Sequence, residues 1–320
     1  MGFNVGVYSN QLNTKNPISS LVNTLTSIFW EGNYLKLYES SYVTANNKGY
    51  FSDRLSYSIG GSLEKRIPLF NTSAYTWSKN LKEYTSNAPE NIEVASTKFV
   101  EHNALLLNLG LEYRPWLKFK IKNGVKQIIS SSSPTFNILY KSGLPVFVTS
   151  NLADFNQIEI GYKQSFRPGA KGQFFIDAKA GAFINKEPQV FIDFKHFSGN
   201  ESPFLMQNPV GSYRLLPYYN FSTYNKYITG QVLYQFRKFL FTQLPVLRLT
   251  GLKELAYVSY LATPTSGNYI EVGYGLDNLF RILRVEAAAS FIDGNYTGIG
   301  FKIGLATSIS TGEGSINIGF

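Results

Sequence analysis

Apolar and polar residues alternate with a period of two along many short stretches of this chain. Between His102 and Arg114, for example, the odd positions from 105 to 113 are leucine or tyrosine, and they oppose Asn108 and Glu112. Successive side chains of a β-strand point to opposite faces, so this alternation predicts strands with one apolar and one polar face. The same alternation recurs in Arg54–Arg66, Leu117–Lys122, Ile158–Tyr162, Val190–Lys195, Gln231–Arg237, Ile270–Asp277, Leu283–Phe291 and Ile299–Leu305.

Two kinds of all-β protein produce this pattern. In a soluble sandwich or closed barrel, the apolar face points inward and forms a filled core. In an outer-membrane barrel, the apolar face points at lipid and the polar face lines a hydrated lumen. The polar faces of the predicted strands carry charges of both signs, which indicates a hydrated interior with ion-paired walls.

Aromatic residues and connection lengths also favour the membrane barrel. Aromatic side chains cluster near predicted strand ends, as at Tyr113, Trp116 and Tyr296, where an outer-membrane barrel has its aromatic girdles. Connections alternate between short and long, as periplasmic turns and extracellular loops do. The short connections are Arg114–Trp116, Asn185–Pro188 and Asp277–Phe280, and the long ones are Ile67–Lys98 and Ser198–Lys226.

The sequence therefore predicts an all-β fold, a transmembrane, antiparallel, up-and-down β-barrel of the outer membrane. About 14 of its strands are expected within this chain. The barrel is expected to occupy residues 1–305, with Gly2–Ser9 as its first strand and Thr297–Leu305 as its last. Residues 306–320 are expected to form a C-terminal tail or an added edge strand.

The C-terminus itself carries a second signal. Ile316, Ile318 and terminal Phe320 fit the alternating, aromatic-ended pattern by which many outer-membrane barrels are recognised for assembly. If Gly312–Phe320 were the last membrane strand, the alternation of connections would put the long ones in the periplasm. For that reason Thr297–Leu305 is the preferred final strand.

One segment departs from the strand period. Within Pro17–Glu31, Leu21, Leu25 and Ile28 recur at helical spacing, after Asn16 as the expected N-cap and Pro17 as the first helical residue. We expect a short amphipathic helix that packs on the rim of the barrel. A plug or gate is the alternative interpretation.

Composition excludes several kinds of chemistry. The chain has no Cys, so it has no thiolate nucleophile and no metal site that needs sulfur. It has two His, at 102 and 196, which excludes a His-rich metal centre, and no cofactor is predicted. No stretch of about 18 apolar residues indicates a transmembrane helix. Net charge is +9, but Lys and Arg are scattered singly, so no nucleic-acid partner is predicted.

A catalytic interpretation rests on three neighbouring residues. His196, Ser198 and Asn200 resemble the Ser, His and Asn sets of barrel phospholipases, in which a base activates the hydroxyl. Three such residues within five positions do not easily form a triad on one strand, because alternate side chains point to opposite faces. We predict that the protein is not an enzyme.

Charged residues on the polar faces are the stronger functional candidates. They are expected to pair across strands and keep the interior wet, or else to line a permeation path or anchor an inward loop. The candidates for lining the lumen are Asp193, Lys195, Glu271, Arg284 and Glu286.

Five ordered segments resemble an uncharacterised family of outer-membrane proteins from Bacteroidota. Members of that family carry an N-terminal carboxypeptidase-regulatory-like domain, followed by a barrel similar to the BamA/TamA assembly superfamily. The segments are Asn33–Glu39 (NYLKLYE), Phe191–Asn200 (FIDFKHFSGN), Leu215–Thr223 (LLPYYNFST), Phe241–Glu254 (FTQLPVLRLTGLKE) and Asn268–Glu286 (NYIEVGYGLDNLFRILRVE).

The resemblance implies sixteen strands and a long sixth extracellular loop that folds into the lumen. Counted back from the last strand, Ser198–Lys226 takes the place of that loop, and Arg214 lies near its Arg-Gly-Phe tip, although the Gly and Phe are missing here. Gly2–Ser9 becomes the third of the sixteen strands. The chain is then expected to be a C-terminal fragment whose signal peptide and upstream domain precede it.

The resemblance also implies a location and a function. The protein is expected in the bacterial outer membrane, in contact with outer-membrane lipid and lipopolysaccharide. It would assist the insertion or export of outer-membrane proteins or surface lipoproteins, its clients. The alternatives are a passive porin or solute channel and a soluble all-β binding protein.

Overall fold

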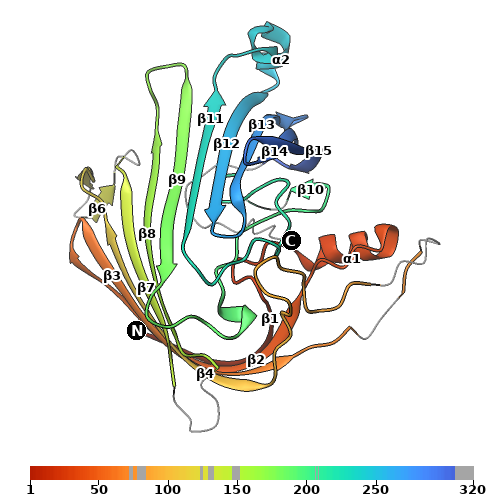
Figure 1. Cartoon of the computed structure of the whole chain (residues 1–320). Helices are drawn as coiled ribbons and strands as arrows, with labels where there is room; N and C mark the ends of the chain where they lie inside the picture. Colours follow the sequence, from red (N-terminus) through yellow and green to blue (C-terminus); the bar gives the residue numbers. More distant parts are fainter. Residues whose placement is uncertain are drawn as a thin grey trace.

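The computed structural model describes residues 1–71, 75–77, 84–122, 125–128, 133–145, 152–205, 207 and 209–306. Within this part of the chain, thirteen strands form one strongly curved sheet around a concave interior (Figure 1). Every pair of neighbouring strands is antiparallel except the last, in which the two-residue strand β10 lies parallel to β15. The prediction of an all-β, antiparallel fold is confirmed.

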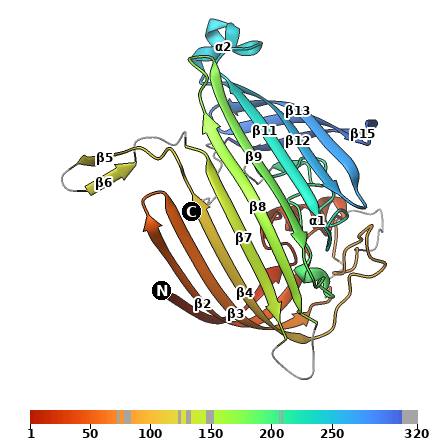
Figure 2. The same cartoon turned by 60° about the vertical axis from the view of Figure 1, so that its left-hand side comes forward.

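The strands follow one another around the sheet in chain order, with β10 at the end. Their bounds are β1 Gly2–Gln11, β2 Leu37–Ser52, β3 Leu55–Pro68, β4 His102–Tyr113, β7 Thr135–Leu144, β8 Phe155–Phe166, β9 Gly172–Phe183, β11 Tyr227–Phe236, β12 Lys253–Thr263, β13 Gly267–Leu279, β14 Leu283–Ile292, β15 Asn295–Leu305 and β10 Phe204–Leu205. A separate hairpin, β5 (Phe119–Lys122) and β6 (Val125–Ile128), projects away from the sheet in Figure 2.

The apolar face of the sheet is the convex one. Val258, Ile299 and Phe301 are 49%, 61% and 69% exposed on strands β12 and β15. Residues of the opposite parity on the same strands, such as Ser259 and Lys302, are buried. The alternation read from the sequence therefore places apolar side chains outside and polar side chains inside.

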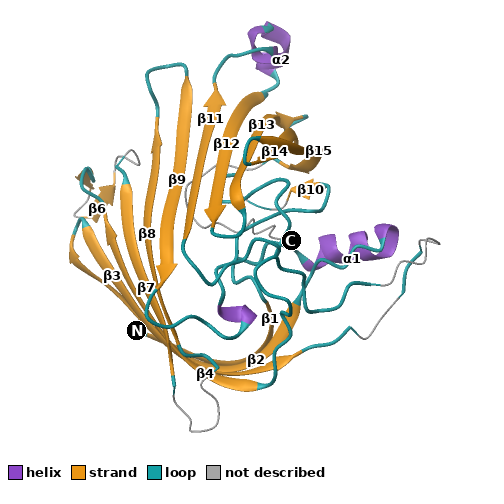
Figure 3. Ribbon diagram, viewed as in Figure 1, coloured by secondary structure: helices purple, strands orange, loops and turns teal. Residues whose placement is uncertain are grey.

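Within the described residues, four short helical segments interrupt the connections, and Figure 3 colours helices purple. Helix α1 (Ser20–Trp30) joins β1 to β2, and η1 (Phe191–Asp193) lies between β9 and β11. Helices η2 (Phe241–Gln243) and α2 (Pro245–Leu249) join β11 to β12. Because α1 and α2 follow strands of opposite direction, they lie at opposite ends of the sheet (Figure 1).

The predicted helix exists, but its N-cap is not Asn16. The hydroxyl of Ser19 accepts from the backbone N–H of Val22 at 3.2 Å, and the helix begins at Ser20. Asn16 has a φ of 48°, in the left-handed region, so Pro17 follows a turn and does not open the helix. Both residue types are good caps, and the tertiary path of the chain decides between them.

Two predicted strands do not belong to the sheet. Val190–Lys195 forms η1 and the loop after it, so Asn185–Pro188 is not a turn between strands. All five residues from 190 to 194 are buried, so the segment does not have one buried and one exposed face as a surface strand would. The second is Leu117–Lys122, because Phe119–Lys122 forms β5, which pairs with β6 and not with β4. Arg114–Trp116 therefore does not connect two neighbouring strands of the sheet.

Among the described residues, β1 and β15 do not pair with each other, and the outer edge of β15 pairs only with the two residues of β10. We call this outer edge of β15 the seam. The described residues end at Ala306, and the predicted C-terminal signal of Ile316, Ile318 and Phe320 lies outside them.

Candidate functional site

Residues 184–226, which connect β9 to β11, fold into the concave side of the sheet (Figures 1 and 3). We call this segment the inward loop; residues 206 and 208 of it are outside the described part. Its two arms are joined by backbone hydrogen bonds, such as Lys195 N–H to Thr223 O at 2.8 Å and Tyr213 N–H to Ser198 O at 2.8 Å. Buried aromatic side chains, among them Phe197, Tyr213 and Phe221, pack the loop against the wall.

Arg214 anchors the middle of the inward loop to β14. Its side chain is 1% exposed, and Nε donates to Glu286 Oε2 at 2.7 Å. Nη1 donates to the carbonyls of Pro209 and Ser212, each at 2.7 Å. The guanidinium carbon also lies 4.2 Å from the ring centre of Tyr257 on β12. Arg214 therefore holds its own turn together and fixes that turn to the wall.

Glu271 on β13 holds the backbone beside Arg214. Its carboxylate is fully buried and accepts the N–H groups of Arg214, Leu215 and Leu216 at 2.7, 2.8 and 3.0 Å. The hydroxyl of Tyr269 donates a fourth hydrogen bond at 2.6 Å. Hydrogen bonds to a charged acceptor are stronger than neutral ones, so this carboxylate is a strong fixing point for the loop.

The wall charges form a chain with the loop arginine. Arg284 donates to Asp277 Oδ1 at 3.0 Å and lies 3.9 Å from Glu286 Oε1. Four predicted residues, Arg214, Glu271, Arg284 and Glu286, are thus brought together in one buried cluster. Buried ions need such partners, because an isolated charge in a low-dielectric interior is costly.

Asp193 and Lys195 lie in the loop and not on a strand, contrary to the prediction; Asp193 is buried and Lys195 is partly exposed. Asp193 Oδ2 accepts from Arg66 Nη1 on β3 at 2.8 Å, and Oδ1 lies 3.5 Å from Lys141 Nζ. Burial alone would raise the pKa of Asp193, but Arg66 and Lys141 hold it below its ordinary value. Lys195 forms an ion pair with Glu159 on β8. Both residues attach the first arm of the loop to the wall.

His196 has a partner that the sequence did not suggest. Its Nδ1 lies 2.8 Å from the hydroxyl of Ser222, on the opposite arm of the loop. Burial lowers the pKa of His196 to about 3. The amide of Asn200 instead donates to the carbonyl of Phe204 at 2.9 Å. His196, Ser198 and Asn200 thus stabilise different turns of the loop.

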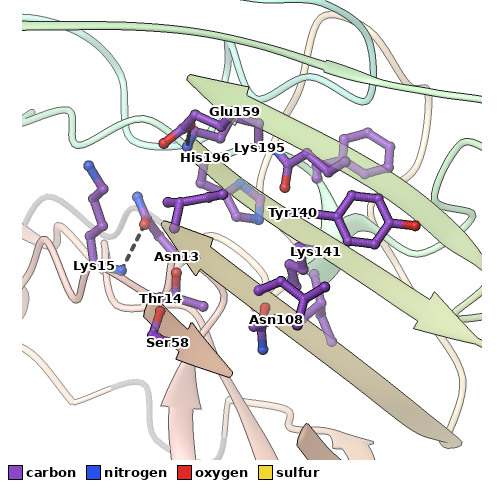
Figure 4. Close-up of a pocket in the computed structure, with 16 residues that line it drawn as sticks. Asn13, Thr14, Lys15, Ser58, Asn108, Tyr140, Lys141, Glu159, Lys195 and His196 are labelled. Carbon is purple, nitrogen blue, oxygen red and sulfur yellow. Dashed lines mark hydrogen bonds and ion pairs between the residues drawn. The ribbon is translucent and has the colours of Figure 1, made fainter. Parts of the chain in front are cut away.

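Two cavities lie on the side of the interior that the loop does not fill. The first, about 250 Å³, lies between the loop and β3, β4, β7 and β8, and Figure 4 shows residues that line it. These include Ser58, Asn108, Lys141, Glu159, Lys195 and His196. The second, about 600 Å³, is lined by residues that include Lys48, Glu112, Arg114 and Lys163. Because Ser58, Gly110 and Leu139 line both, the cavities are neighbours.

The sequence did not reveal which wall residues contact the loop. Arg66 and Lys302 have inward parity, but their partners are 127 and about 100 positions away. Across the part of the chain that is described, no cluster of three or more His, Asp or Glu is arranged to hold a metal ion. Neither described helix is long and apolar enough to cross a bilayer.

Comparison with known families gives one match. Residues 1–276 match the C-terminal domain of a family of unknown function, DUF5686. No curated protein matches the chain.

Proposed function

We propose that this chain, which belongs to the DUF5686 family through its C-terminal domain, is an outer-membrane β-barrel that assists the insertion or export of outer-membrane or surface proteins. The observation that carries the proposal is the inside-out sheet, with apolar residues outside, buried charges inside and a long loop fixed to the inner wall. Each part of that arrangement supports one part of the function.

The convex face supports the membrane location. Large exposed apolar patches on a protein surface mark contact with another protein or with lipid. Here the exposed apolar residues lie on strands around the whole sheet, from Val43 on β2 through Ile160 on β8 to Phe301 on β15. Lipid acyl chains can cover such a band completely, and outer-membrane lipid and lipopolysaccharide are the partners that we propose for it.

The seam supports the assisting function. Edge strands present unpaired N–H and C=O groups, and these are templates for pairing with another chain. Inside a bilayer an unpaired edge is especially costly, because no water can hydrogen-bond to it. An incoming client strand would satisfy those groups, so the seam would lower the barrier to inserting that strand. No covalent chemistry is required.

The anchored loop supports the likeness to the BamA/TamA superfamily. In that superfamily an inward loop carries an arginine at its tip, and here Arg214 has a buried carboxylate partner on the wall, Glu286. The proposal extends to upstream strands that precede β1 and complete a barrel of sixteen. The Gly and Phe of the superfamily tip are absent, and contacts from Pro209 and Ser212 take part in fixing Arg214.

A passive channel is the second candidate, and the two cavities favour it. They are lined by polar and charged side chains of both signs and share lining residues. A channel predicts large and steady single-channel conductance in a planar bilayer. A silent or flickering trace would contradict it.

Depletion of the full-length protein from cells tests the proposed function. We expect the amounts of other outer-membrane barrels or surface lipoproteins to fall within a few generations, as measured by quantitative proteomics of isolated outer membranes. Re-expression of the wild-type protein should restore them. An unchanged outer-membrane proteome after depletion would refute the proposal.

A further inference from the structure

The inward loop occupies part of the free edge of β15. Phe204 and Leu205 form β10, which lies parallel to Ile303 and Gly304. The backbone N–H of Ile303 donates to the carbonyl of Pro203 at 2.9 Å. A segment of the loop therefore takes the place that a neighbouring strand would take at this end of β15.

Lys302 fixes that segment from the inner face of β15. The side chain is buried, and Nζ donates to the carbonyls of Asn200 and Ser202 at 3.1 and 2.7 Å. The turn is also held internally, since the hydroxyl of Ser202 donates to Asn200 Oδ1 at 3.0 Å. A buried ammonium whose hydrogen bonds go to two main-chain carbonyls of one turn positions that turn firmly.

The same segment also contacts the connection between β1 and β2. Asn13, just after β1, donates its side-chain amide to the carbonyl of Phe197 at 3.0 Å. Gln207 donates to the carbonyl of Pro17 at 2.8 Å. The ring of Phe204 lies edge-on to Trp30 of α1, with centroids 6.3 Å apart. Loop residues thus link the edge of β15 to the connection between β1 and β2, although the described β1 and β15 share no hydrogen bonds.

We propose that residues 197–205 and 207 are a clasp that covers the seam, and that a client must displace the clasp before an extended strand can dock on the edge of β15. This inference rests on the proposed function, because it specifies where the client strand binds. The clasp replaces a strand ladder with a short contact that can be exchanged. Its partner is an extended polypeptide strand, recognised by main-chain hydrogen bonds.

The lengths of the strands make the exchange favourable. β15 has eleven residues, whereas β10 covers two of them. A longer incoming strand would form several more main-chain hydrogen bonds along the same edge than β10 does. Close approach of β10 also depends on Gly304, because a Cβ there would lie 2.7 Å from both the Cβ and the carbonyl oxygen of Leu205.

The first experiment releases the clasp and measures amide hydrogen exchange of the full-length protein in lipid nanodiscs. Gly304→Ala should push β10 away, and Lys302→Met should remove its two hydrogen bonds without adding bulk to the edge. Each should raise the exchange rate of the Ile303 amide roughly tenfold. Gly298→Ala is the matched control on the same face of β15, because the nearest heavy atom to its added Cβ is 3.9 Å away. Unchanged exchange in both variants would overturn the proposal.

The second experiment fixes the clasp in place. The chain has no native Cys, so Phe204→Cys with Ile303→Cys provides a defined cross-link. The oxidised protein should fail to restore outer-membrane proteins in depleted cells, and reductant should recover the activity. Ala289→Cys with Ile299→Cys is the control, since these residues already pair between β14 and β15. If the oxidised clasp pair restores the outer-membrane proteome as fully as the control pair, the clasp does not open in function and the proposal is wrong.

A third measurement separates this inference from the proposed function. A synthetic peptide that copies β14, the strand that β15 already pairs with, serves as the probe strand. Its binding to nanodisc protein should increase at least about tenfold in Gly304→Ala and disappear in the oxidised clasp pair. If depletion leaves the proteome unchanged but peptide binding follows this pattern, the proposed function fails and the clasp stands. If binding is the same in all variants, the clasp fails.

Discussion

Removing the positive charge of Arg214 should detach the centre of the inward loop. Arg214→Met keeps most of the side-chain volume but removes the donors to Glu286, Pro209 and Ser212. Glu286 is then left buried, and among the described residues Arg284 at 3.9 Å is its remaining ion-pair partner. Removing one partner of a buried ion pair typically costs about 3–5 kcal/mol.

Urea titration of the protein in lipid vesicles, followed by tryptophan fluorescence, measures that cost as a change in the free energy of unfolding. Limited proteolysis reports the loop separately, because residues 209–216 should become cleavable in the variant. Lys65→Met is the matched control: Lys65 pairs with Glu101 at 2.7 Å, but both side chains are about half exposed. An exposed pair of this kind contributes roughly 0–1 kcal/mol.

A double variant makes the interpretation stricter. In Arg214→Met with Glu286→Gln, the uncompensated carboxylate is gone, so part of the lost stability should return. If Arg214→Met destabilises the protein no more than Lys65→Met, the Arg214–Glu286 pair does not fix the loop. The same holds if the double variant is as unstable as the sum of the single variants.

Three other perturbations follow from the same structure. The pKa of His196 is about 3 in the folded protein, below its ordinary value, so folding disfavours the protonated form and stability falls as pH decreases from about 7. Between pH 7 and pH 5 that loss should be about 2 kcal/mol in urea titrations and should shrink in His196→Gln; an equal loss in both proteins would contradict the assignment. Asp193→Asn leaves Arg66 with Glu64 as its one remaining ion pair among the described residues, at 2.9 Å, so we expect a loss of about 3 kcal/mol or more in the same titration. Glu254 accepts the Thr242 N–H at 2.8 Å, and Glu254→Gln should make residues 237–252 easier to cleave by protease without loosening the inward loop.

The alternation of residues identified the meander because each outer strand face is uniform along its length. Leu105, Leu109 and Tyr113 on β4 follow it, and their neighbours on β3 and β7 continue it. The rule failed at Val190–Lys195, where Val190, Ile192 and Phe194 share one parity but Phe191, of the opposite parity, is apolar as well. There the segment is surrounded by the loop and the wall, so burial does not depend on parity.

The loop contacts could not be predicted, because local sequence does not specify them. Glu271 is recognisable as an inward carboxylate on β13, but its three backbone partners are 55 to 57 positions away. β10 has two residues, too few for a periodic signal, and its existence depends on Lys302 and Gly304 across the edge. Short elements held by distant side chains lie beyond what hydrophobic pattern can resolve.

The signs of the buried charges determine how the inward loop fits its wall. The first arm supplies an anion, Asp193, to a wall cation, Arg66 on β3. The middle supplies a cation, Arg214, to a wall anion, Glu286 on β14. Interchanging the two contacts would place Asp193 against Glu286 and Arg214 against Arg66. The free-energy cost of burying such like-charge pairs would be prohibitive. Charge complementarity therefore favours one orientation of the loop against the wall. In that orientation, residues 200–205 lie at the edge of β15.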